Sequence, residues 1–187
     1  MVTSNWHKVR EISQILAPFG IKVEMLNVEK VEVQDDDVAY IAKRAVGHLC
    51  PHYDYVVVDD TGLYIEALGG FPGPYAEYVY RTIGLEGVLR LLSGIDNRRA
   101  TFRCAAAICV GGEVRVFVGE VNGEISHTPR GAGGFGYDPI FIPEGYFKTY
   151  AELGDEVKNK ISHRAKAFRA LADWLQSRGY NNSSRDL

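Results

Sequence analysis

Two adjacent carboxylates, Asp59 and Asp60, directly follow the apolar run 55–58. The run predicts a buried strand over 54–58, and α/β proteins bind ligands at the ends of such strands. Neighbouring residues point to roughly opposite sides, so we expect one carboxylate to face a metal ion while the other organises the loop. Mg²⁺ commonly takes one or two carboxylates together with phosphates and waters. Gly62 would allow a sharp turn here, and a strand cap made by an Asx turn is the alternative.

A polar segment near residue 1 has the composition of an anion site. Thr3, Ser4 and Asn5 are good N-cap residues, and helical spacing of apolar residues over 9–19 predicts a helix after them. The free N–H groups and the positive dipole end would then lie at one spot, where Lys8 adds a full charge toward a phosphate. Ordinary capping beside a solvated lysine is the alternative.

Glu32 lies between Val31 and Val33, so alternation directs its side chain away from their face. Taken alone, it is a solvent-facing strand residue.

The glycine-rich stretch 131–139 contains G-x-G-x-x-G but is not a dinucleotide fingerprint, because no helix can follow its prolines. The glycines indicate a backbone that approaches a ligand closely. Phe135 and Tyr137 could stack on a flat ring, and Asp138 could accept hydrogen bonds. A surface loop with aromatic anchors is the alternative.

Cationic residues gather before the last predicted helix. Ser162 is a plausible N-cap, which puts His163 and Arg164 in the first turn, where cations oppose the macrodipole. That cost suggests an anion held nearby, and Lys158 and Lys160 add to the basic cluster. A solvated charged face, with His163 as a structural histidine, is the alternative.

The composition fits one domain with a sizeable core: 187 residues, 46% of them hydrophobic and 24% charged. A net charge of -3 gives no basic field, so we expect no nucleic-acid partner. We see neither a signal peptide nor an apolar run near the ~20 residues of a membrane span, and we expect a cytoplasmic protein. Cys50, Cys104 and Cys109 lack metal-ligand spacing and are expected to be reduced thiols.

The elements that must position these residues form a mixed sheet with flanking helices, an α/β (mixed α+β) fold. The expected helices are 9–19, 38–49, 85–92 and 161–175. The expected strands are 21–26, 54–58, 100–110, 113–121 and 141–143. Gly111 and Gly112 form a hairpin turn between two of the strands. We expect one domain over 1–178 and a polar, frayed tail over 179–187.

In this order the stretches resemble the inosine triphosphate pyrophosphatase family, the non-canonical purine nucleoside triphosphate pyrophosphatases. The similarity runs from residue 3 to about 175, with Ser4 and Thr61 where many members have Gly and Ser. Trp6 and His7 occupy variable places of the family motif. The matching stretches are TSNWHK (3–8), VEVQ (31–34), VVDDTGLYIEALGGFPGPY (57–75), RATFRC (99–104), PRGAGGFGYDPIF (129–141) and KNKISHR (158–164).

The resemblance implies an elongated fold with two lobes around a central cleft, usually as a homodimer. It implies Mg²⁺-dependent cleavage of inosine, deoxyinosine and xanthosine triphosphates into a monophosphate and pyrophosphate. By position, the resemblance implies that residues 3–8 bind the phosphates and that Glu32 and Asp60 bind the metal. It also implies that Asp60 accepts the proton of the attacking water. The substrate residues that it implies are Thr3, Ser4, Asn5, Trp6, His7, Lys8, Thr61, Phe135, Gly136, Tyr137, Asp138, Lys158, His163 and Arg164.

Three other functions fit parts of the pattern. A Maf-type nucleotide pyrophosphatase shares the chemistry but uses other nucleotides. A haloacid-dehalogenase-like phosphatase also has acids after a strand, although its nucleophile and acid are two places apart and not adjacent. A nucleotide sensor would bind a triphosphate without turnover. Intact Glu32, Asp60 and Lys8 favour an enzyme over a sensor.

Overall fold

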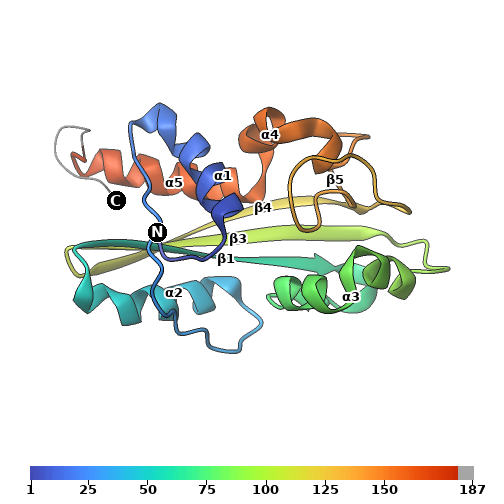
Figure 1. The fold of residues 1–187 in the computed structure, drawn as a ribbon, viewed down its shortest axis with the longest axis horizontal. Coiled ribbons are helices and arrows are strands. Elements are labelled where there is room, and N and C mark those ends of the chain that lie inside the picture. The colour runs from blue at the N-terminus through green and yellow to red at the C-terminus, as the bar shows by residue number, and fades with distance from the viewer. Residues whose placement is uncertain (181–187) are drawn as a thin grey trace.

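A long antiparallel sheet forms the centre of the molecule, in the strand order β2-β1-β3-β4-β5 (Figure 1). The computed structural model describes residues 1–180, so most of the expected tail lies outside the described residues. The strands are β1 (Tyr55–Ile65), β2 (Pro72–Gly73), β3 (Arg99–Val110), β4 (Glu113–Ile125) and β5 (Phe141–Pro143). The expected α/β class is confirmed, with every pairing of this sheet antiparallel and none parallel.

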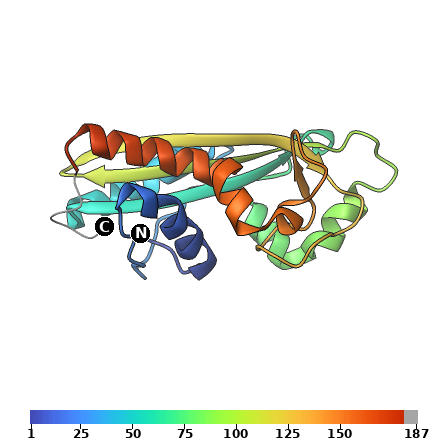
Figure 2. The same cartoon turned by 90° about the horizontal axis from the view of Figure 1, so that it is seen from above.

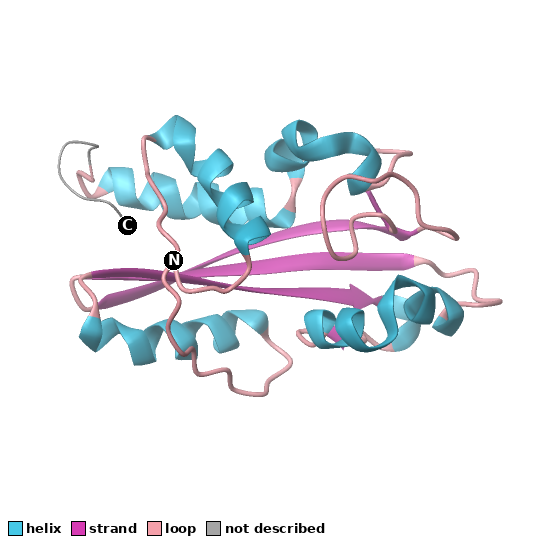
Figure 3. Cartoon of the chain, in the orientation of Figure 1, coloured by secondary structure: helices cyan, strands magenta, loops and turns pink. Residues whose placement is uncertain are grey.

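Helices cover both faces of the sheet, as the cyan ribbons of Figure 3 show. In Figure 1, α1 and α5 lie on one face and α2 on the other, while α3 and α4 lie toward the opposite end. Figure 2 shows α5 running along the sheet, where it packs on β3 and β4. The helices are α1 (Trp6–Leu16), α2 (Val38–Leu49), α3 (Ala76–Leu91), α4 (Tyr150–Ile161) and α5 (His163–Ser177).

Three elements differ from the sequence-based expectation. The strand expected over 21–26 is wrong, because this segment makes only one bridge, between Val2 and Leu26. The helix expected over 85–92 begins at Ala76 instead and kinks at Gly84, whose φ of 64° is left-handed. Helix α4 was not predicted, although Thr149 and Glu152 form the capping box that starts it.

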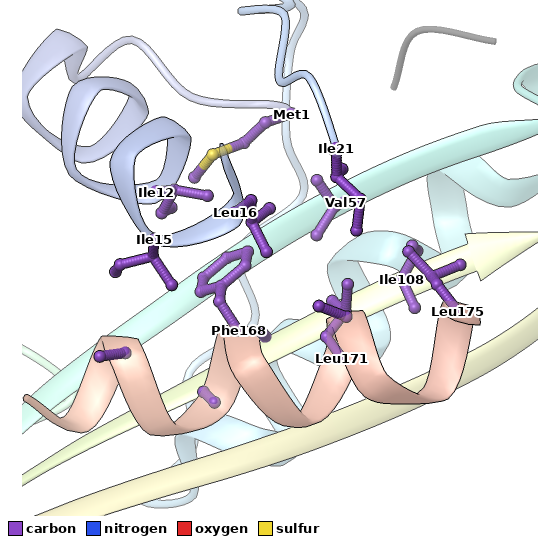
Figure 4. Close-up of a cluster of buried hydrophobic side chains, with 14 of the residues drawn as sticks. Met1, Ile12, Ile15, Leu16, Ile21, Val57, Ile108, Phe168, Leu171 and Leu175 are labelled. Carbon is purple, nitrogen blue, oxygen red and sulfur yellow. The ribbon is translucent and has the colours of Figure 1, made fainter. Parts of the chain in front are cut away.

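The core consists of three hydrophobic clusters. Figure 4 shows the first, where Ile12 and Leu16 of α1 meet Phe168 and Leu171 of α5 over Val57 of β1. The second lies under α2 on the other face of the sheet. The third joins α3, β5 and α4 at the opposite end. The hydrophobic core is thus divided between the two ends of the sheet.

Cys50 and Cys109 form a disulfide across 59 residues of sequence, with Cα atoms 5.5 Å apart. The prediction of reduced thiols is therefore wrong for this pair, while Cys104 is free and buried. Cys50 follows α2 and Cys109 lies on β3. Their proximity arises from the packing of α2 on the sheet, which sequence spacing does not show. No helix within residues 1–180 is both long and apolar enough to cross a membrane.

Candidate active site

Asp59 and Asp60 lie in the middle of β1, so the prediction that they end the strand is wrong. Backbone pairing with β3 continues through both residues to Ile65. Gly62 makes no turn, since it pairs with Arg103 within the strand. A Cβ at Gly62 would lie 3.0 Å from the Gly73 backbone, so glycine permits the close approach of β2.

The two carboxylates face opposite sides of the sheet, as expected from strand alternation. Asp59 shares its face with Val57 and contacts residues of α1 and α5. Asp60 shares its face with Val58, which packs under α2. The opposite orientation gives the adjacent acids different surroundings.

Asp59 is a buried anion held by two cations. Lys8 Nζ lies 3.2 Å from Oδ1, and Arg164 donates to Oδ2 through Nε and Nη2, both at 3.3 Å. Burial alone would raise the pKa of Asp59, but Lys8 and Arg164 hold it at about 2. Arg164 Nη2 also donates to Thr61 Oγ1 at 3.2 Å. Asp59 is therefore charged at neutral pH and orders Lys8, Arg164 and Thr61.

Asp60 has the opposite character. Its buried Oδ2 has no hydrogen-bond partner among the described residues. Burial raises its pKa to about 6, against the lowering effect of Lys8 and Lys30. A carboxyl group with a free oxygen and a pKa near neutrality is suited to act as a general base or as a metal ligand.

Glu32 lies in a loop and not in a strand, with its side chain 62% exposed. Its Oε1 lies 2.7 Å from Lys30 Nζ, and both residues act electrostatically on Asp60. Within residues 1–180, no group of three or more His, Cys, Asp or Glu residues could hold a metal ion. The two predicted metal ligands, Glu32 and Asp60, interact electrostatically with each other and with Lys30.

A second buried ion cluster lies beside the first and centres on Glu11, which the sequence analysis missed. Lys158 Nζ lies 2.9 Å from Glu11 Oε1 and 2.7 Å from Asp138 Oδ2, and Arg164 Nη1 donates to Glu11 Oε2. Burial opposes ionisation of Glu11, but Arg164 and Lys158 lower its pKa overall. In the sequence, Glu11 could have been found from its place three residues after Lys8, which puts both residues on the same side of α1.

The glycine-rich stretch folds over Asp138, which accepts the N–H of Phe135 at 2.9 Å. Phe135 lies beneath two cations, with Lys158 Nζ 4.6 Å and Arg164 Cζ 5.6 Å from its ring centroid. Gly136 follows with a left-handed φ of 59°. Tyr137, by contrast, leaves no exposed ring face on which a flat ligand could stack as predicted. Tyr137 is buried in the core and donates its hydroxyl to the carbonyl of Ala76 at 2.6 Å.

His163 and Arg164 begin α5, and Ser162 caps the helix by accepting the N–H of Ala165 at 3.1 Å, as predicted. His163 is not a second cation, however. Burial and then the neighbouring Arg164 lower its pKa well below the ordinary value. Its ring stacks on Phe102, 4.4 Å between centroids, and its Nδ1 has no partner among the described residues.

A cavity of about 100 Å³ lies between α1, the 131–138 loop and α4. Its lining includes His7, Glu11, Phe135 and Lys158, which places it beside the second ion cluster. A larger cavity, of about 510 Å³, lies near the end of α3 and includes none of the predicted site residues.

Lys8, Lys158 and Arg164 thus converge from α1, α4 and α5 near one side of the sheet, and Lys8 also acts electrostatically on Asp60 of β1. The fold and site define an α/β protein in which three cations and three carboxylates form a network of ion pairs beside the central sheet. The chain belongs to the Ham1 family, whose model matches residues 1–174. The family resemblance predicted from the sequence is confirmed.

Known proteins match this chain over nearly its whole length. A dITP/XTP pyrophosphatase of Pyrobaculum aerophilum is 71% identical over 179 residues, which cover 95% of this chain and 96% of the relative. A dITP/XTP pyrophosphatase of Ignicoccus hospitalis is 50% identical over 177 residues, which cover 93% and 94%. The solved structure of a HAM1 protein from Coxiella burnetii superposes with a TM-score of 0.79 at 29% identity, covering 94% of this chain and 96% of that one.

Proposed function

We propose that the protein is a dITP/XTP pyrophosphatase. It hydrolyses the non-canonical purine nucleoside triphosphates dITP, XTP and ITP to a monophosphate and pyrophosphate. The name carried by relatives up to 71% identical supports this proposal. The structural observation that carries it is Asp60, a carboxyl group with an unpaired buried oxygen and a pKa of about 6.

Asp60 and Glu32 would hold Mg²⁺, since the unpaired oxygen of Asp60 and the exposed carboxylate of Glu32 are the hard ligands that this ion prefers. The bound ion would offset the charge that develops on the phosphates. Asp60 would orient the attacking water and accept its proton, and a pKa near the working pH makes both roles compatible.

Thr3, Ser4, Asn5 and Lys8 would bind the phosphates at the beginning of α1. Asn5 Oδ1 already accepts the N–H groups of His7 and Lys8, at 3.0 and 3.4 Å, so those two groups are partly satisfied by the cap. The phosphates would therefore meet chiefly the Lys8 ammonium and the positive end of the helix. The Thr61 hydroxyl, held by Arg164, would contact the substrate from β1.

The purine base would contact two groups of residues. These are Phe135, Gly136 and Asp138 of the glycine-rich loop, and Lys158, His163 and Arg164 at the end of α4 and the start of α5. His163 is a neutral ring with an unpaired Nδ1, which suits a hydrogen bond to the edge of a base. A buried site that pairs with a 6-keto purine rejects a 6-amino purine, because the wrong base leaves polar groups unpaired. Tyr137 would support this site from the core.

We also propose that residues 1–178 form one domain of two lobes that acts as a homodimer in the cytoplasm, where nucleotide pools are maintained. The three core clusters divide between the two ends of the sheet, which supports two lobes. Tyr78 and Tyr80 on α3 are 60% and 40% exposed, and exposed aromatic residues of this kind are enriched at interfaces.

The test is a turnover panel with Mg²⁺ and the triphosphates of inosine, deoxyinosine, xanthosine, adenosine, guanosine and thymidine, with all products identified. We expect monophosphate and pyrophosphate from the first three and little from the others. Preference for another base would favour a Maf-type enzyme, and free phosphate a phosphatase. Tight binding without turnover would indicate a sensor. Asp54→Asn, the same change at an exposed aspartate six residues before Asp60, is the matched control for Asp60→Asn.

A further inference from the structure

Three aromatic rings form a continuous stack at the edge of the proposed nucleotide site. The rings of Trp6 and His7 lie 3.8 Å apart between centroids, with planes inclined by 28°. The His7 ring in turn lies 5.2 Å from that of Phe135, inclined by 20°. The stack thus joins the first turn of α1 to the glycine-rich loop, which is remote in sequence.

The stack covers a space that is small for a nucleotide base. The cavity lined by His7, Phe135 and Lys158 measures about 100 Å³. Small-molecule sites in proteins usually measure about 300–1,000 Å³. A purine that uses Phe135 must therefore open the contact between the Phe135 and His7 rings.

The Phe135 ring and the Trp6–His7 pair differ in how firmly they are held. The N–H of Phe135 is bound to Asp138, which is bound to the buried ammonium of Lys158. Trp6, in contrast, is 55% exposed, and the His7 side chain is half-buried. His7 and Phe135 are both half-buried, but Lys158 and Arg164 also contact the Phe135 ring. Exposed side chains change rotamer within nanoseconds, so Trp6 can move and leave His7 free to follow, while Phe135 is held in place.

We propose that His7, backed by Trp6, is a movable aromatic wall of the base site. The purine enters between the rings of His7 and Phe135 and replaces their mutual stacking with its own. The inference rests on the proposed function and revises one part of it, because it moves Trp6 and His7 from the phosphates to the base. The other residues of the segment 3–8 keep their phosphate role.

The binding test separates base from phosphate. A Trp174→Phe protein retains Trp6 as its single tryptophan. We expect its fluorescence to change with a dITP analogue that has a methylene group between the α- and β-phosphates, and not with inorganic triphosphate. Binding of the analogue in calorimetry without a change in Trp6 emission would overturn the proposal, as would an equal change with inorganic triphosphate.

The kinetic test uses His7→Ala and the aromatic replacement His7→Phe. We expect His7→Ala to raise the KM for dITP roughly 5- to 10-fold, with no change in the inhibition constant of inorganic triphosphate. His7→Phe should restore the KM, because stacking needs a ring and not an imidazole. Tyr40→Ala, an exposed aromatic change on α2, is the control and should leave the KM unchanged.

The inference and the proposed function fail in different ways. If the KM for dITP is the same before and after His7→Ala, the proposed function stands and the proposal of an aromatic wall is overturned. Equal rises in the KM for dITP and in the inhibition constant of triphosphate would return His7 to the phosphates. Lack of dITP turnover in the unsubstituted protein would overturn both.

Discussion

Asp59 and Asp60 are covalent neighbours, yet their carboxyl pKa values lie on opposite sides of the ordinary value, at about 2 and about 6. Both are buried or nearly so, and the difference arises from what each meets across the sheet. Lys8 and Arg164 bind Asp59 directly. Asp60 keeps an oxygen without a partner among the described residues. One acid therefore holds the structure and the other is available for chemistry.

The pH dependence of activity should report Asp60. In the proposed mechanism the charged form of Asp60 is the active one, and burial raises its pKa to about 6, so kcat/KM at limiting Mg²⁺ should fall about tenfold per pH unit below 6. Saturating Mg²⁺ should move this limb to lower pH, because the ion competes with the proton. Rates measured from pH 4.5 to 8 at two Mg²⁺ concentrations test this, and a flat profile at limiting Mg²⁺ would contradict it.

Asp60→Asn should lose activity and gain stability. Removal of a general base lowers turnover by about 10²- to 10⁴-fold. The folded pKa lies above the unfolded value of 3.8, so the protonated form stabilises the fold and that contribution is lost as the pH rises through 6. At pH 8 the variant should therefore be more stable by up to about 3 kcal/mol, and at pH 3.8 by much less. Urea unfolding at both pH values measures this, and lower stability of the variant at pH 8 would refute it.

Asp59→Asn should destabilise the protein strongly, because it leaves Lys8 and Arg164 facing a neutral group. Breaking a buried ion pair costs about 3–5 kcal/mol. The folded pKa of Asp59 is lowered, so its contribution is complete above 3.8 and is lost only as the pH falls through about 2. Urea unfolding at pH 5 and pH 8 should thus give the same large loss. Asp54→Asn, on an exposed residue before β1, should change the free energy of unfolding little. Equal losses of stability in Asp59→Asn and Asp54→Asn would contradict the ion-pair role of Asp59.

The Cys50–Cys109 disulfide should contribute to stability by restricting the unfolded chain. A bridge across 59 residues corresponds to about 4 kcal/mol in the chain-entropy account. We expect a reductant to lower the Tm of the unsubstituted protein by several degrees. Cys50→Ser should have a Tm near that of the reduced protein, with no response to reductant. A Tm of the unsubstituted protein that ignores the reductant while free thiols appear would contradict the prediction.

Local signals in the sequence predicted several elements. The apolar stripe of α2, the cap at Ser162 and the Gly111-Gly112 turn all appear where expected. Each depends on residues within one turn of helix or one hairpin, which propensity and periodicity describe well. The motif order also determined the family, because motifs record chemistry directly.

Other features depended on partners that are distant in sequence. β1 passes through two carboxylates because β3 pairs with it and cations meet Asp59. Local pattern alone ends that strand at the first acid. Tyr137 is a core residue because its hydroxyl reaches Ala76, 61 residues away.

Sequence patterns alone predicted the family, the phosphate chemistry of its motifs and most of the helices. The folded structure was needed to show which charges neutralise one another: Glu11 with Lys158 and Arg164, and Asp59 with Lys8 and Arg164. It also decided that Asp60 keeps a free oxygen and that His7 stacks on Phe135. The physical reason is that burial and charge pairing depend on distances in space, which sequence spacing does not set.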